Sequence, residues 1–224
     1  NALIYARKVI DSGKFPLEDK LNIRSFVAGT ITEKEAIWGV YTTQILDNIK
    51  KNFYTYDMTF TWLPADDNTA LYSVAQEDGN DMRGNDWFRI LIGEDESDRI
   101  VRCMKIVNET KISDPGAYTS KRIEGINMIR IPEMYLIAAE ALLESDPDEA
   151  QKYFDTFIVS RGLFKYKDRP GSPQVTLEDI VKERRKEFVQ EGQYFYTLKR
   201  DNMNIYVDAL KTTLQGTDEL YTFI

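Results

Sequence analysis

Six charged residues in the second half of the sequence have types and spacings that could support chemistry. They are Arg130, Glu133, Glu140, Arg184, Glu187 and Glu191. Two facing carboxyl groups can hydrolyse a glycosidic bond, one as the acid and the other as the base or nucleophile. On a helix, however, residues three or four positions apart also form ordinary ion pairs. Arg184, Glu187 and Glu191 have this spacing.

The position of Arg184 favours ion pairing over catalysis. It falls on the apolar helix face that carries Val181 and Phe188, where a buried guanidinium needs acceptors. Glu140 or Glu133 on a facing helix can supply them. We therefore interpret the six residues as a structural charge network. We expect Arg184→Ala to cost ~3–5 kcal/mol, the usual cost of breaking a buried pair.

Aromatic and amide residues in the middle of the sequence could bind a sugar. An aromatic face can stack on the C–H face of a sugar ring, and amides can bond its hydroxyls. Tryptophan and tyrosine are also frequent core residues, so both interpretations remain open. The candidate ligand-binding residues are Trp62, Tyr72, Trp87, Asn68 and Asn85.

Composition excludes several other functions. The chain has no histidine and one cysteine, which rules out a Ser-His-Asp or Cys-His triad and any histidine-ligated zinc site. Its net charge of −8 disfavours binding to a phosphate backbone, so we expect no nucleic-acid partner. No phosphate-binding loop, dinucleotide fingerprint or EF-hand is present. We predict no cofactor and no metal.

Helical patterns that could position these residues lie at both ends of the chain. Residues 2–12 read as one helix, with Gly13 as its stop. A second helix begins at Pro132, and a third follows the Asp146–Pro147 cap signal and ends at Gly162. The last two form an antiparallel pair of about 30 residues, close to the ~34-residue tetratricopeptide period.

Another pair of helices follows in the sequence. Thr176 is an N-cap candidate with Asp179 three residues later. Gly192 marks a break, and Tyr194 begins a second short helix. Such pairs cannot bury their apolar faces alone, so they stack on neighbouring pairs.

The middle of the chain, from about residue 52 to 125, is dense in turn-forming residues. We expect an irregular segment with short helices and a hairpin. Long loops in compact domains are often functional. Residues 34–51 could form either a strand or a helix. The predicted fold is therefore mainly α, with tetratricopeptide-like helix pairs at 1–13 and 129–200 and a loop-rich insertion.

Several of these segments together resemble the SusD/RagB family. Residues 129–141 are similar to its helix signature, and residues 154–163 to its "LN-x-x-R-x-x-RG" segment, although Asp155 stands where Asn is usual. Asp81 and Arg83 resemble its "D-x-R" element. A further block resembles "E-R-x-x-E-F-x-x-E-G-x-x-F-x-x-L-K-R"; it comprises Glu183, Arg184, Glu187, Phe188, Glu191, Gly192, Lys199 and Arg200.

The resemblance implies a SusD-like α-α superhelix in residues 1–224, as one fragment from the C-terminal portion of a longer protein. It implies a binding protein and not an enzyme. Such a protein would capture an oligosaccharide or another nutrient at the bacterial outer-membrane surface and deliver it to a SusC-like TonB-dependent transporter. Membrane attachment would be through an N-terminal lipid anchor outside this sequence. The alternatives are a tetratricopeptide-type scaffold for peptides or proteins and a carboxylate-dependent hydrolase.

Overall fold

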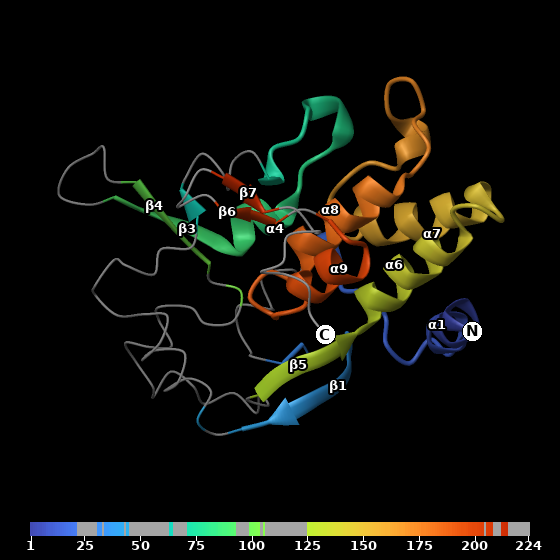
Figure 1. The fold of residues 1–224 in the computed structure, drawn as a ribbon, viewed down its shortest axis with the longest axis horizontal. Coiled ribbons are helices and arrows are strands. Elements are labelled where there is room, and N and C mark those ends of the chain that lie inside the picture. Colours follow the sequence, from blue (N-terminus) through green and yellow to red (C-terminus); the bar gives the residue numbers. More distant parts are fainter. Residues whose placement is uncertain are drawn as a thin grey trace.

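A computed structural model describes residues 1–21, 31–32, 34–42, 44, 63–64, 71–92, 99–103, 105, 125–203, 205–207 and 212–214. Figure 1 shows most of the helices grouped together, with short strands beside and below them. The fold is mainly α, as the sequence predicts. Among the described residues, no helix is both long enough and apolar enough to span a bilayer.

The central helix pair is formed by α6 (Ile131–Leu142) and α7 (Pro147–Val159). The turn between them is so short that the two helices run antiparallel. The side chain of Asp146 caps α7 by accepting a hydrogen bond of 3.0 Å from the backbone N–H of Glu149. Pro147 occupies the first turn, where a helix has no use for its missing N–H. The cap predicted from the sequence is confirmed.

Helix α1 (Ala2–Asp11) packs on α6 and buries Ala6. Gly13 follows it with φ at +61°, a left-handed conformation that favours glycine after a helix. Arg7 bonds the carboxylate of Glu149 and donates to the Tyr153 hydroxyl at 3.2 Å. These contacts fasten α1 to the α6–α7 pair.

Two further helices follow, α8 (Leu177–Glu187) and α9 (Tyr194–Arg200). The Thr176 side chain accepts from the Asp179 N–H, and the Asp179 carboxylate accepts from the Thr176 N–H. This is the capping box expected from the sequence. Gly192, with φ at +72°, lies in the connection between α8 and α9.

The helices α6, α7 and α8 enclose one continuous apolar core, which we call the apolar cluster. On α6 and α7 its side chains are spaced three or four residues apart, so each of these two helices turns one face inward. The apolar cluster consists of Leu136, Ala139, Leu142, Ala150, Phe154, Phe157, Ile158, Leu163, Val175, Ile180 and Phe188.

A two-stranded ribbon leads into α6. Strand β1 (Ala36–Tyr41) pairs antiparallel with β5 (Gly125–Arg130), and Ala36 faces Arg130 at the base. The sequence left residues 34–51 open between strand and helix, and the structure shows a strand over their described part. The helical segment begins at Ile131 and not at 129, because the two preceding residues complete β5.

The described part of the middle segment contains a three-stranded sheet in the order β2-β4-β3. Strand β3 (Phe88–Ile92) and strand β4 (Arg99–Cys103) form an antiparallel hairpin, and β2 (Leu63–Pro64) pairs with β4. Before the hairpin come the short helices η3 (Gln76–Asp78) and α4 (Met82–Asp86).

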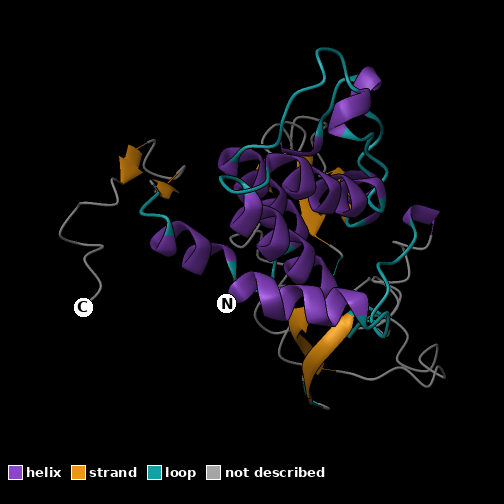
Figure 2. Cartoon of the chain, turned by 90° about the vertical axis from the view of Figure 1, so that its right-hand side faces the viewer, coloured by secondary structure: helices purple, strands orange, loops and turns teal. Residues whose placement is uncertain are grey.

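The fold also contains a short 3-10 turn and a small C-terminal hairpin. A 3-10 turn, η5 (Tyr166–Asp168), lies between α7 and α8. Near the end of the chain, β6 (Ile205–Val207) pairs with β7 (Thr212–Leu214). Figure 2 shows this hairpin set apart from the main group of helices. The interpretation of residues 1–224 as one domain with a loop-rich insertion stays a prediction.

Candidate functional site

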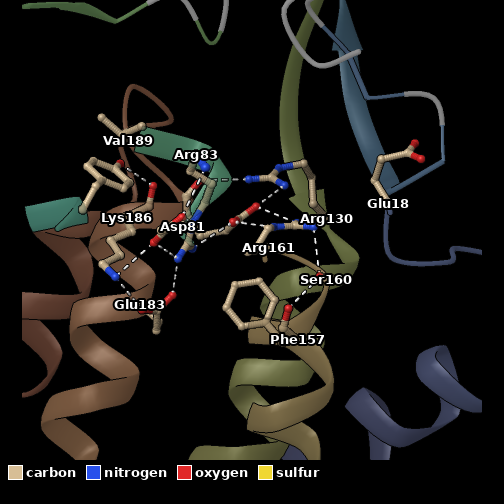
Figure 3. A network of polar contacts seen from close by, with 12 residues as sticks. Glu18, Asp81, Arg83, Arg130, Phe157, Ser160, Arg161, Glu183, Lys186 and Val189 are labelled. Carbon is tan, nitrogen blue, oxygen red and sulfur yellow. Dashed lines mark hydrogen bonds and ion pairs between the residues drawn. The ribbon is translucent and has the colours of Figure 1, made fainter. Parts of the chain in front are cut away.

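A second buried region lies next to the apolar cluster and is made of charged side chains. We call it the ionic cluster. None of its side chains is more than 6% exposed. Figure 3 shows Arg83, Arg130 and Arg161 directed toward a common centre. The ionic cluster consists of Glu35, Asp81, Arg83, Lys105, Arg130, Arg161, Glu183, Lys186, Glu187 and Glu191.

Glu187, in the last turn of α8, is the central acceptor. One of its carboxylate oxygens accepts from Arg161 Nε at 2.9 Å and from Arg83 Nη1 at 3.3 Å. The other accepts from Arg130 Nη1 at 2.8 Å and Arg161 Nη2 at 2.9 Å. Burial alone would raise the pKa of Glu187, but the arginines outweigh it and hold that pKa well below its ordinary value. The carboxylate therefore stays ionised.

Arg83 brings the middle segment into the ionic cluster. Asp81 caps α4 by accepting from the backbone N–H of Arg83, and its carboxylate also accepts from Arg83 Nε and Nη2, both at 2.8 Å. Arg83 Nη2 donates to Glu183 on α8 at 2.6 Å. Lys186 Nζ lies 3.1 Å from Asp81. Burial would raise the pKa of Asp81, yet the attraction of Arg83 and Lys186 lowers it.

Arg130 connects the β1–β5 ribbon with the end of α8. Its Nη1 donates to Glu35, just before β1, at 3.0 Å. Its Nε and Nη2 donate to the two carboxylate oxygens of Glu191 at 3.1 and 2.7 Å. Glu35 also accepts from Arg161 Nη2, at 3.0 and 3.1 Å. The base of the ribbon is thereby held against both α7 and α8.

Lys105, which follows strand β4 by two residues, also belongs to the ionic cluster. Its ammonium donates to the backbone carbonyl of Glu187 and to the carboxylate of Glu191, and it lies 4.4 Å from the centre of the Trp87 ring. Burial lowers the pKa of Lys105 and nearby Arg130 lowers it further, while Glu191 and Glu187 act in the opposite direction.

This geometry suits a structural role better than a catalytic one. A general acid or base needs an oxygen that can reach substrate. The carboxylates of the ionic cluster are closed to solvent and already bound by arginine or lysine. Each pair is directional, so the cluster fixes which segments meet and in what register.

Three of the six network residues predicted from the sequence lie together in the ionic cluster. These are Arg130, Glu187 and Glu191. Arg184 and Glu140 form a separate pair, with Arg184 Nη2 3.1 Å from Glu140.

The separate pair is more open than the ionic cluster. The Glu140 side chain is 25% exposed and also binds Arg200, at 2.9 Å. Among the described residues, Glu133 joins no ion pair. Burial raises the pKa of Glu133, although Arg184 and Arg130 oppose this.

The other members of the ionic cluster were not predicted as network residues from the sequence. Arg161 carries a usable signal, because it follows Phe154 and Phe157 by seven and four residues and so continues the buried face of α7. Asp81, Arg83 and Glu183 appeared only within the family resemblance. Glu35 and Lys105 lie outside any helical pattern, and no local spacing indicates that they are buried.

The predicted ligand-binding residues are dispersed. Tyr72 and Trp87 lie in the interior, 6% and 0% exposed. The Tyr72 hydroxyl donates to the Lys186 carbonyl at 2.9 Å, and Trp87 packs against Val189. Neither ring offers a face on which a sugar could stack in this structure. Asn85 is exposed. Trp62 and Asn68 lie outside the described residues, so a ligand-binding role for this set stays a prediction.

A metal site is not visible in the described part of the chain. No group of three or more histidine, cysteine, aspartate or glutamate residues there is arranged to hold an ion.

Solved structures share the fold of this chain. A SusD superfamily protein from Bacteroides thetaiotaomicron is 24% identical, with a TM-score of 0.66 over 96% of this chain and 51% of its own. A SusD-like carbohydrate binding protein from Bacteroides vulgatus is 20% identical, with a TM-score of 0.59 over 95% of this chain and 46% of its own. A surface glycan-binding protein A from Bacteroides uniformis is 22% identical, with a TM-score of 0.58 over 86% and 43%.

The chain thus spans about half the length of these solved relatives. No curated protein matches it. The family model described as the SusD family matches residues 26–223, which is most of the sequence. The protein belongs to the SusD family.

Proposed function

We propose that this chain is part of a non-catalytic nutrient-binding protein and that its ligand is a glycan. The single observation that carries the proposal is the family match over residues 26–223. Two structural relatives are described as a carbohydrate binding protein and a surface glycan-binding protein. The ionic cluster supports binding without turnover, because its buried carboxylates are engaged by cations.

We also propose a cellular location and a partner protein. By family membership, the whole protein would sit at the outer-membrane surface through an N-terminal lipid anchor. It would pass its ligand to a SusC-like TonB-dependent transporter. Within this chain, the helix pairs supply the rigid body, and the middle segment supplies exposed polar side chains such as Asn85.

Calorimetry against a panel of oligosaccharides tests the proposal, together with an assay for released reducing sugar. We expect saturable heat with at least one oligosaccharide and no release of reducing sugar. Release of sugar would point to a hydrolase. Binding to a transporter peptide without any saccharide binding would favour the tetratricopeptide-type scaffold.

A pair of matched variants examines the predicted ligand residues. Asn85→Ala removes an exposed amide, and loss of one hydrogen bond to a ligand weakens binding by several-fold. Ser145→Ala, at an exposed position in the turn between α6 and α7, should leave the affinity unchanged. If both variants bind as tightly as the wild type, Asn85 is not a ligand residue.

A further inference from the structure

Two segments that are far apart in the sequence meet in a short backbone pairing. Gly79, just after η3, forms an antiparallel bridge with Leu163, which lies in the connection between α7 and α8. The Phe164 N–H donates to the Asp78 carbonyl at 2.8 Å. Leu163 is buried and belongs to the apolar cluster, whereas Phe164 is 51% exposed. The bridge therefore places an exposed aromatic residue opposite Asp78.

The close approach of the two segments depends on glycine on both sides. A Cβ atom on Gly79 would lie 2.8 Å from the backbone nitrogen of Phe164, and one on Gly162 would collide with the carbonyl oxygen of Asn80. Both glycines have positive φ, at +109° and +96°, which other residues rarely adopt. The Asn80 N–H donates to the Gly162 carbonyl at 3.1 Å. The side chains on either side of the glycines are thus brought together.

The side chains gathered at the bridge are of the types that bind a sugar. The Phe164 ring is open to solvent, Asn80 is exposed, and the Asp78 side chain is 29% exposed. Asn85 on α4 is also exposed, and its Nδ2 donates to Asn80 Oδ1 at 3.4 Å. An aromatic ring can stack on the C–H face of a sugar, while amides and a carboxylate can bond its hydroxyls.

The ionic cluster lies next to the bridge and holds both segments in place. Asp81 follows Asn80 in the sequence, Arg161 precedes Gly162, and both charged residues belong to the ionic cluster (Figure 3). The Met82 N–H donates to the Arg161 carbonyl at 3.0 Å. Side chains on backbone that is already fixed lose little freedom when a ligand binds, so less of the binding energy is spent on ordering them.

Arg169 holds the other end of the exposed group. Its Nε donates to the Phe164 carbonyl at 3.1 Å and lies 3.6 Å from Asp78 Oδ1. Its guanidinium carbon lies 4.2 Å from the centre of the Tyr166 ring. The arginine thus balances the charge of Asp78, and a balanced carboxylate suits the hydroxyls of an uncharged ligand better than it suits an anion.

We propose that the exposed side chains around this bridge form a contact site for a neutral saccharide, which we call the bridge site. It consists of Asp78, Asn80, Asn85 and Phe164. The Phe164 ring stacks on the apolar face of one sugar unit, and the amides and the carboxylate bond its hydroxyls. The inference rests on the proposed function, because it names the place in this chain where a glycan binds. It supplies the exposed aromatic face that the two buried aromatic candidates do not offer.

Calorimetry with a panel of neutral oligosaccharides of glucose, galactose, mannose and xylose tests the bridge site in the 224-residue chain. The variants are compared on the oligosaccharide that the wild type binds most tightly. Phe164→Ala should weaken binding on the order of ten-fold or more, because it removes the stacking ring. Asn80→Ala removes one hydrogen-bonding group and should weaken binding several-fold. Phe164→Trp keeps an aromatic face and should bind at least as tightly as the wild type.

The control is Tyr5→Ala, which removes an exposed aromatic ring on α1 and should not change the affinity. If the wild type binds a saccharide and Phe164→Ala binds it equally well, the bridge site is wrong and the proposed function stands. Equal weakening by Phe164→Ala and Phe164→Trp also overturns the bridge site, because stacking would then not be the interaction lost. If the wild type binds no member of the panel, the proposed function fails for this chain and the bridge site fails with it.

Fluorescence provides a readout that a purely structural role of Phe164 would not change. A sugar stacked on the indole of the Phe164→Trp variant shields that indole from water. Saturation with the same oligosaccharide should therefore shift the variant's emission to shorter wavelength, after subtraction of the change seen in the wild type. An unshifted difference spectrum at saturation contradicts stacking at this position.

Discussion

The apolar cluster and the ionic cluster are both buried and both include residues of α8, yet they connect different parts of the chain. The apolar cluster joins α6, α7 and α8, which are close in sequence. The ionic cluster joins α8 to Glu35, Arg83 and Arg130, and Glu35 meets Arg161 across 126 residues. Apolar contacts are non-directional, whereas guanidinium–carboxylate pairs have fixed geometry. We infer that the first holds neighbouring helices together and the second selects the distant segments that dock on them.

The largest expected effect comes from Glu187→Ala in the ionic cluster. It leaves Arg83, Arg130 and Arg161 without their shared acceptor, and an uncompensated buried charge costs ~3–5 kcal/mol. Urea unfolding followed by circular dichroism measures the loss in free energy of unfolding. A loss below about 1 kcal/mol would mean that the arginines find water or other partners.

The effect of Glu187→Ala should depend on pH with a defined sign. The pKa of Glu187 is lowered in the folded protein, so its contribution is fully present above the ordinary glutamate pKa. It is lost as pH falls through the lowered value. The difference between wild type and variant should therefore be constant near neutrality and shrink below about pH 4. A stability difference between wild type and variant that grows toward acid pH would mean that the pKa of Glu187 is raised, not lowered, in the folded protein.

The matched change in the apolar cluster is Leu136→Ala. Leu136 is 0% exposed, and truncating a buried leucine costs ~2–5 kcal/mol, depending on how far the cavity collapses. The same unfolding measurement applies. This loss should not vary between pH 4 and 8, because no ionisable group is removed. If the loss for Leu136→Ala depended strongly on pH, the apolar cluster and the ionic cluster would not contribute independently to stability.

The difference between the clusters also explains what the sequence could predict. Spacings of three and four residues and cap signals identified the helix at 2–12, the helix that begins at Pro132 and the helix between Asp146 and Gly162, because those signals are local. Arg130, Glu187 and Glu191 were predicted to belong to a structural charge network. Glu35 and Lys105 were not, because their partners are 95 and 86 residues away. For Tyr72 and Trp87, the sequence could not distinguish a core role from a ligand-binding role. The burial of these side chains depends on how the middle segment docks on the helices.

A smaller effect is expected for Arg184→Ala. The sequence predicted ~3–5 kcal/mol for a buried pair. In the structure its partner Glu140 is 25% exposed and keeps Arg200, so little charge is left unpaired. We expect a loss of about 1 kcal/mol in the free energy of unfolding. A loss of about 4 kcal/mol would place this pair energetically with the ionic cluster.

The smallest effect, of opposite sign, is expected for Glu133→Gln. Burial raises the pKa of Glu133, so its ionised form is less favourable in the folded protein than in the unfolded chain. The stability linked to this group is present below the ordinary pKa and is lost as pH rises through the raised value. The amide should therefore stabilise the protein at pH 7, by no more than about 1 kcal/mol. A lower thermal midpoint would show that Glu133 is paired in solution.

A double-mutant cycle between Glu35 and Arg161, which are 126 residues apart, tests most directly whether the ionic cluster is a directional lock between distant segments. The single variants Glu35→Ala and Arg161→Ala and the double variant are compared by urea unfolding at pH 7. Because Arg161 Nη2 donates to both carboxylate oxygens of Glu35, at 3.0 and 3.1 Å, we predict a coupling energy of about 2 kcal/mol or more. Losses that add to within about 0.5 kcal/mol would contradict it.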